Sequence, residues 1–175
     1  MTTNRIKAVA AILAIAVSLP FFGRNWHRCM HLLGAVMFLG DILVTAVWVS
    51  VARKNRDPEV ARVLVRGLFL TDALFLLPGV LLLLLNGGQL GLEWFKAGAA
   101  WIMISVVLFL LTGLVYGVLL EPVQKKLARA VDATPRGGAL PPEYDALMAK
   151  WFRWGGIATL LPLLTFVLMV FKPTF

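Results

Sequence analysis

Five uninterrupted apolar stretches run along the chain, separated by short polar segments. They cover residues 8–22, 30–51, 67–85, 97–120 and 154–171. A helix needs roughly 20 apolar residues to cross the hydrocarbon core of a bilayer. Because lipid offers the backbone no hydrogen-bond partners, such stretches form helices. The pattern predicts an all-α fold, a polytopic helical membrane bundle of about five transmembrane helices.

The first stretch is the shortest, and Pro20 lies near its end. By helix rise it spans only about 22 Å. Arg5 and Lys7 before a short apolar segment are also typical of a signal peptide, but no small-residue cleavage motif follows. We interpret residues 8–22 as a retained, short first transmembrane helix.

The composition agrees with a membrane location. Hydrophobic residues make up 60% of the chain and charged residues only 15%, so a water-soluble globule would lack the polar side chains to cover its surface. The single cysteine, Cys29, excludes an internal disulfide. We expect one integral membrane domain over residues 1–175, with the loop at 121–153 as its only sizeable polar part.

The net charge of +8 is distributed unevenly over the loops of this arrangement. Thirteen Lys and Arg residues fall on the side of the N-terminus and four on the other side. By the positive-inside rule, the N-terminus and the loop at 121–153 face the cytoplasm and the C-terminus faces outside. The basic charge is thus an orientation signal, and no motif supports nucleic-acid binding.

The loop at 121–153 is itself expected to be partly helical. Residues 123–133 have a helical composition, and the segment TPRGGALPP at 134–142 is typical of a turn. Residues 143–154 are expected to begin the helix that enters the last span.

One face of the second predicted helix carries a polar stripe. At a spacing of three to four residues the stripe contains His27, His31, Gly34, Phe38, Asp41, Thr45 and Trp48. These positions fall on about a third of the helix circumference. Polar groups inside a membrane are costly and face the protein interior. We expect this face to point into the bundle, with Gly34 allowing a neighbouring helix or a flat ligand to approach closely.

Three interpretations of the stripe remain open. In the first, His31 and Asp41 hydrogen-bond across helices and hold the bundle together. In the second, His31 is an axial ligand of haem b. Two histidines four residues apart cannot reach opposite faces of one porphyrin. The second axial ligand is therefore either absent or supplied by another helix, where Met103 of the fourth span is the nearest in depth. In the third, His27, Met30 and His31 form a soft donor set suited to copper.

The apolar stretches contain two acids, Asp41 and Asp72. Asp72 is expected either to pair with a cation such as Arg66 or to act as a proton or quinone site. Glu93 lies just outside the fourth span. It is expected either to orient a histidine or to be solvated.

Gly113 and Gly117 form a G-x-x-x-G pattern on the fourth span. Small residues at this spacing let helices approach closely, so the pattern predicts a contact within the bundle or the face of a homo-oligomer. The sequence contains no Ser-His-Asp order and no H-E-x-x-H motif, so nothing indicates a hydrolase.

Three segments together resemble a known family. They are HLLGAVMFLGDILVTAVW at 31–48, RGLFLTDALFLLPGV at 66–80 and the segment from LPPEYDALMAKWFRW at 140 to residue 173. Their order and spacing resemble an uncharacterised bacterial family of integral membrane proteins, domain of unknown function 2269. That family is distantly similar to copper-resistance D and protoporphyrinogen-oxidase-like membrane proteins.

The resemblance implies a multi-pass protein of the bacterial inner (cytoplasmic) membrane. It also implies that His31 is the family's helix histidine and Asp72 its third-helix acid, while residues 1–25 precede the family's usual start. Our first hypothesis is binding of haem or copper through His31 in electron transfer or cofactor handling, with Glu93 or His27 supporting the ligand and Asp72 relaying protons. The alternative is a non-catalytic accessory subunit packed against a larger membrane complex.

Overall fold

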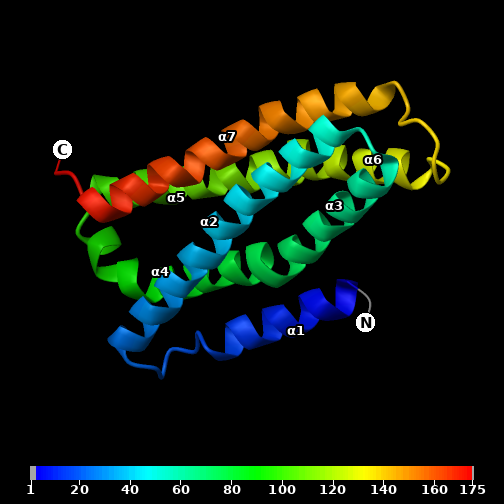
Figure 1. Cartoon of the computed structure of the whole chain (residues 1–175). Helices are drawn as coiled ribbons and strands as arrows, with labels where there is room; N and C mark the ends of the chain where they lie inside the picture. The colour runs from blue at the N-terminus through cyan, green and yellow to red at the C-terminus, as the bar shows by residue number, and fades with distance from the viewer. Residues whose placement is uncertain (1–2, 175) are drawn as a thin grey trace. The chain divides into compact units, whose positions relative to one another are not determined.

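A computed structural model describes residues 3–174, and the regular secondary structure of this part is all helical. Adjoining segments make five continuous helices in this part of the chain. Figure 1 labels the α-helical segments. In chain order the segments are α1 (Thr3–Ala16); α2 (Arg24–Asn55); α3 (Pro58–Thr71), η1 (Asp72–Leu76) and α4 (Leu77–Lys96); α5 (Ala100–Leu114), η2 (Val115–Leu120) and α6 (Glu121–Asp132); and α7 (Glu143–Phe171).

Four of these continuous helices are long and apolar enough to cross a membrane. They are Arg24–Asn55, Pro58–Lys96, Ala100–Asp132 and Glu143–Phe171. The prediction of helices over the last four apolar stretches is therefore confirmed, and the helices continue past those stretches at their polar ends. The fifth predicted span, at 8–22, is not confirmed, because α1 has 14 residues and ends at Ala16, before Pro20. The side that each terminus faces stays a prediction.

The chain divides into two compact units. Unit 1 comprises residues 1–44 and 68–99, which include α1, the first part of α2, η1 and α4. Unit 2 comprises residues 45–67 and 100–175, which include the end of α2, most of α3, and α5 to α7.

Two π-helical turns, η1 and η2, each end two residues before a proline, Pro78 and Pro122. A proline has no N–H to donate, and its ring clashes with the carbonyl four residues earlier. A wider π-helical turn moves that carbonyl aside. The helix can therefore continue through each proline, and in the first case Asp72 is the first residue of the widened turn.

In unit 1, α2 and α4 approach each other through two glycines. A Cβ atom at Gly34 would lie 2.9 Å from the carbonyl oxygen of Gly79 and from the backbone nitrogen of Leu83. A Cβ atom at Gly79 would lie 2.9 Å from the backbone nitrogen of Phe38. The backbone of α4 thus occupies the place beside Gly34. In the same unit, α1 packs along α4 and η1 (Figure 1).

In unit 2, α7 packs against α5, η2 and α6 (Figure 1). Its interior is formed by Leu127, Val131, Tyr144, Met148 and Trp151. The predicted helix, turn and helix within residues 121–153 are confirmed, since α6 ends at Asp132 and α7 begins at Glu143. This polar segment is therefore mostly a continuation of two spanning helices rather than a separate loop.

Candidate functional site

The polar stripe of α2 is largely buried. His27, Phe38, Asp41 and Thr45 are at most 6% exposed. Gly34 is buried as well, and His31 is half-buried. Residues on the opposite face are open to the surroundings, among them Leu32, Val36 and Val47. The expectation that this stripe faces the protein interior is confirmed for these positions, whereas Trp48 is 37% exposed.

The two acids of the apolar stretches meet in unit 1. The carboxyl of Asp41 lies close to the side chains of Asp72 and Thr71. Both Asp41 and Asp72 are 6% exposed. Ionised carboxylates are acceptors only, so two of them cannot hydrogen-bond to each other. A hydrogen bond between Asp41 and Asp72 would therefore require a proton on one of them.

The hydroxyl of Thr71 lies close to the carboxyl of Asp41. It donates its single proton to the backbone carbonyl of Leu68 at 3.1 Å. Nearby on α2, Oδ1 of Asp41 and Oγ1 of Thr45 are buried, and neither has a hydrogen-bond partner among residues 3–174. Buried polar atoms that can accept a hydrogen bond therefore lie along this face of α2.

A second buried network joins three segments of unit 1. Nδ1 of His27 lies 2.8 Å from Oδ1 of Asn86, and because that amide oxygen only accepts, His27 donates. Nδ2 of Asn86 donates to Oγ of Ser18 at 2.7 Å and to the carbonyl of Leu82 at 2.9 Å. The Ser18 hydroxyl in turn donates to the carbonyl of Ala14 at 2.7 Å. The network fastens the end of α1 to α2 and α4.

His31 is held by the backbone of α4. Its Nδ1 lies 3.1 Å from the carbonyl oxygen of Leu83, so Nδ1 carries the proton and Nε2 the lone pair. Its ring packs on Gly87, where a Cβ atom would lie 2.9 Å from Cε1. No group of three or more His, Cys, Asp or Glu residues within the described chain is arranged to hold a metal ion. Met30, the third member of the predicted copper set, is half-buried on α2.

The remaining predicted residues lie outside these networks. The carboxylate of Glu93 accepts a hydrogen bond from Arg24 at 3.0 Å and its side chain is 75% exposed, which corresponds to the solvated alternative. Arg66 donates to Asp132 at 3.0 Å. Met103, the predicted second haem ligand, lies in α5 of unit 2 and is 47% exposed.

The G-x-x-x-G pattern of the fourth span does not form the predicted contact within the bundle. A Cβ atom at Gly113 or at Gly117 would meet nothing within 4 Å in the described chain. A close contact there would require another molecule, so a role in assembly stays a prediction.

Asn86 and Ser18 are functional candidates that the sequence pattern did not single out. Asn86 directly follows a run of five leucines, and Ser18 lies in the shortest of the five apolar stretches. The signal for Asn86 was an amide inside an otherwise apolar helix, where a polar side chain needs a partner on another segment.

Long apolar helices that turn their polar side chains toward one another define a helical integral membrane protein. A family model described as "Predicted integral membrane protein (DUF2269)" matches residues 26–173. The chain belongs to this family, and the match begins after the segment expected to precede it. Neither the curated proteins nor the solved structures give a match. The more distant similarity to copper-resistance D and protoporphyrinogen-oxidase-like proteins is not shown by these comparisons.

Proposed function

We propose that this membrane protein binds and releases a proton at the Asp41 and Asp72 pair as part of its activity. The observation that carries the proposal is the closeness of two buried carboxyls in helices that are long and apolar enough to cross a membrane. Two carboxyls that share one site do not ionise together, because the second negative charge is repelled by the first. Such a pair takes up and gives off single protons.

The free-energy cost of placing Asp41 and Asp72 in membrane helices supports a functional role for them. A carboxyl at the centre of a membrane helix costs about 2.5–3.5 kcal/mol on insertion scales, and this pair contains two. Apolar side chains of similar volume would stabilise the contact between α2 and η1 at no such cost. The π-helical turn that begins at Asp72 also supports a functional role, because single π-helical turns are frequent at functional sites.

Infrared spectroscopy in lipid nanodiscs tests proton binding directly. A protonated carboxyl has a C=O stretching band that an ionised carboxylate lacks. We expect the wild type to show this band at neutral pH and to lose it on titration to alkaline pH, and we expect Asp41→Asn and Asp72→Asn each to remove it. Asp132→Asn, which changes an exposed acid in unit 2, is the matched control. A band that is unchanged in both test variants would contradict the proposal.

Proton transfer is tested separately in liposomes that contain a pH-sensitive dye and a potassium ionophore. We expect the wild-type protein to let protons enter faster than the Asp41→Asn and Asp72→Asn variants do. Equal rates in wild type, variants and empty liposomes would limit the pair to proton binding and contradict a role in transfer.

A second candidate function is suggested by His31. Metal-binding histidines usually donate their other ring N–H to a backbone carbonyl or a carboxylate, and His31 donates Nδ1–H to Leu83. We infer that Nε2 of His31 binds haem b, or copper together with His27 and Met30. The test is an optical spectrum with metal analysis of the purified protein, in which a Soret band should disappear in His31→Ala. A colourless, metal-free preparation would exclude this candidate.

A further inference from the structure

The interface that α2 forms with η1 and α4 in unit 1 has polar side chains at its two ends and none in between. Asp41 and Asp72, the proposed proton site, lie at one end, and the hydrogen-bonded pair of His27 and Asn86 lies at the other. The segments between them, which we call the apolar zone, are residues 32–40 of α2 and 73–85 of η1 and α4. Neither segment contains a polar side chain.

Within the apolar zone the backbones of α2 and α4 meet directly. A Cβ atom at Gly79 would lie 2.9 Å from the backbone nitrogen of Phe38 and 3.1 Å from the carbonyl oxygen of Gly34. A Cβ atom at Gly34 would lie 2.9 Å from Cβ of Leu82. Phe38 and Leu82 are 5% and 4% exposed. Each helix thus occupies the space directly beside the glycine of the other, which leaves no room for a layer of water.

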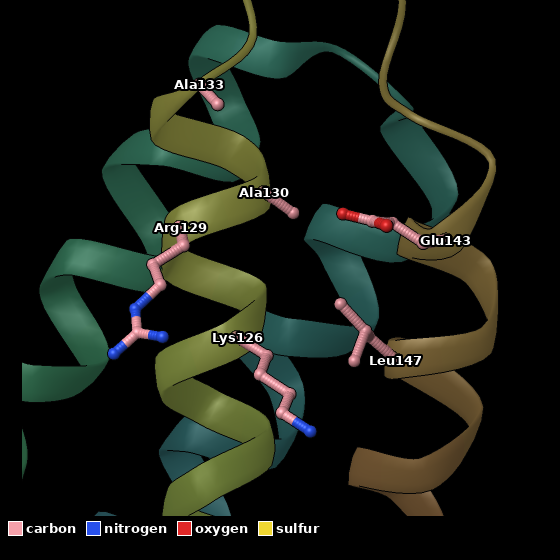
Figure 2. A pocket seen from close by; sticks show the side chains of 6 residues that line it. All are labelled: Lys126, Arg129, Ala130, Ala133, Glu143 and Leu147. Atoms are coloured by element: carbon pink, nitrogen blue, oxygen red, sulfur yellow. The ribbon is translucent and has the colours of Figure 1, made fainter.

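The helices of unit 2 are packed differently and leave open grooves. Figure 2 shows the groove that separates α6 from α7, with Lys126 and Glu143 on its walls and a volume of about 380 Å³. A second groove, of about 410 Å³, is lined by residues of α3 and by Thr134 and Arg136. Volumes of this size admit several water molecules. Neither groove is lined by a residue of the apolar zone.

Phe38 lies between the glycine contact and the proton site on the inward face of α2. By helix rise it is about 4.5 Å from Asp41, which is one turn further along the helix. An apolar constriction excludes water and so interrupts the hydrogen-bonded chain along which protons move. No side chain of the apolar zone binds a proton in place of water. A proton at Asp41 therefore has no route to His27 while this contact is closed.

We propose that Phe38 seals the proton site on the side of the histidines, so that the two acids exchange protons with one side of the membrane only. This inference rests on the proposed binding of a proton by the two acids. Along the helix Pro58–Lys96, Asp72 lies about 9 Å from Arg66 and about 30 Å from Glu93 by helix rise. The open side is therefore the one on which Arg66 lies. Phe38 binds no proton itself and acts by excluding water.

Proton entry into liposomes that contain a pH-sensitive dye and a potassium ionophore tests the seal. Phe38→Ala opens a path for water, and we expect it to raise the rate of proton entry about tenfold over the wild type. Phe38→Leu keeps a large apolar side chain and should leave the rate low. Adding Asp41→Asn to Phe38→Ala should bring the rate back to that of the wild type, because the open path then lacks its proton site.

Two controls separate a seal from a damaged fold. Val36→Ala removes the same kind of apolar bulk from the outer face of α2, where Val36 is 70% exposed, and should leave the rate unchanged. Carboxyfluorescein trapped in the same liposomes should stay inside with every variant. The seal is disproved if Phe38→Ala admits protons no faster than the wild type, if Val36→Ala is as fast, or if carboxyfluorescein escapes through Phe38→Ala.

The infrared band of the protonated carboxyl distinguishes failure of the seal from failure of the proposed function. If the wild type shows the band and Phe38→Ala leaves proton entry unchanged, the seal is wrong and proton binding stands. If the wild type lacks the band, proton binding by the two acids is wrong. A fast rate that persists when Asp41→Asn is added to Phe38→Ala would confirm the seal and contradict a role of the pair in proton transfer.

Discussion

The two units of this protein differ in the side-chain contacts that join their helices. In unit 1, polar groups lie between helices: Asp41 contacts Asp72, and Asn86 joins His27 to Ser18. In unit 2, ion pairs such as that of Arg66 with Asp132 lie at the helix ends and are largely exposed. Its buried hydroxyls at Ser105 and Thr112 bond to carbonyls four residues back in their own helix.

The difference shows which polar residues specify tertiary structure inside a membrane. A hydroxyl that bonds to its own helix is satisfied wherever that helix lies, so it carries little information about neighbours. A carboxyl or amide in the interior needs a partner on another segment, because an unpaired group there costs free energy. Unit 1 therefore joins its helices by buried contacts between polar side chains, while the ion pairs of unit 2 lie near the polar ends of its helices.

The strongest test of this contrast is Gly34→Ala in unit 1. The added Cβ would lie 2.9 Å from backbone atoms of α4, which cannot move aside as a side chain does. We expect a loss of about 3 kcal/mol in unfolding free energy, the upper range for overpacking. Thermal unfolding in detergent, monitored by circular dichroism, measures this loss of unfolding free energy.

Gly40→Ala and Gly113→Ala are the controls for this substitution. A Cβ atom at either position would meet nothing within 4 Å. Replacing a helical glycine by alanine should then stabilise the protein by about 0.5–1 kcal/mol. Equal destabilisation by all three variants would mean that the close approach of α2 and α4 does not set the stability of unit 1.

A somewhat smaller loss is expected from Asn86→Ala. The substitution removes the partner of His27 and of Ser18 and leaves a buried imidazole N–H unsatisfied. We expect a cost of about 2 kcal/mol, typical of an unpaired buried polar group. Because the network fastens α1, limited proteolysis should also cut the first residues faster in the variant.

Thr112→Ala in unit 2 is the matched comparison for Asn86→Ala. It removes a buried hydroxyl whose bond stays within one helix. Its unfolding free energy should change by no more than about 0.5 kcal/mol. If Thr112→Ala costs as much as Asn86→Ala, the distinction between contacts among helices and contacts within a helix is wrong.

The parts that the sequence predicted are those governed by periodicity and hydropathy. Four spans, the inward face of α2, and the turn before Glu143 all follow from local patterns. The first span was wrongly extended through Pro20, because hydropathy alone does not show where a helix ends. The pairing of Asp41 with Asp72 was missed, since it depends on the register of two helices far apart in the sequence. No local pattern encodes that register.

The smallest effect is expected for the ion pair of Arg66 and Asp132 in unit 2. The two side chains are 68% and 48% exposed and 3.0 Å apart. Exposed pairs contribute about 0.2–1 kcal/mol, and salt weakens them. A double-mutant cycle with Arg66→Gln and Asp132→Asn should give a coupling energy of about 0.5 kcal/mol that falls as the ionic strength rises. A coupling above about 2 kcal/mol that is insensitive to salt would mean that this pair is desolvated like the contacts of unit 1, and that the two units do not differ as described.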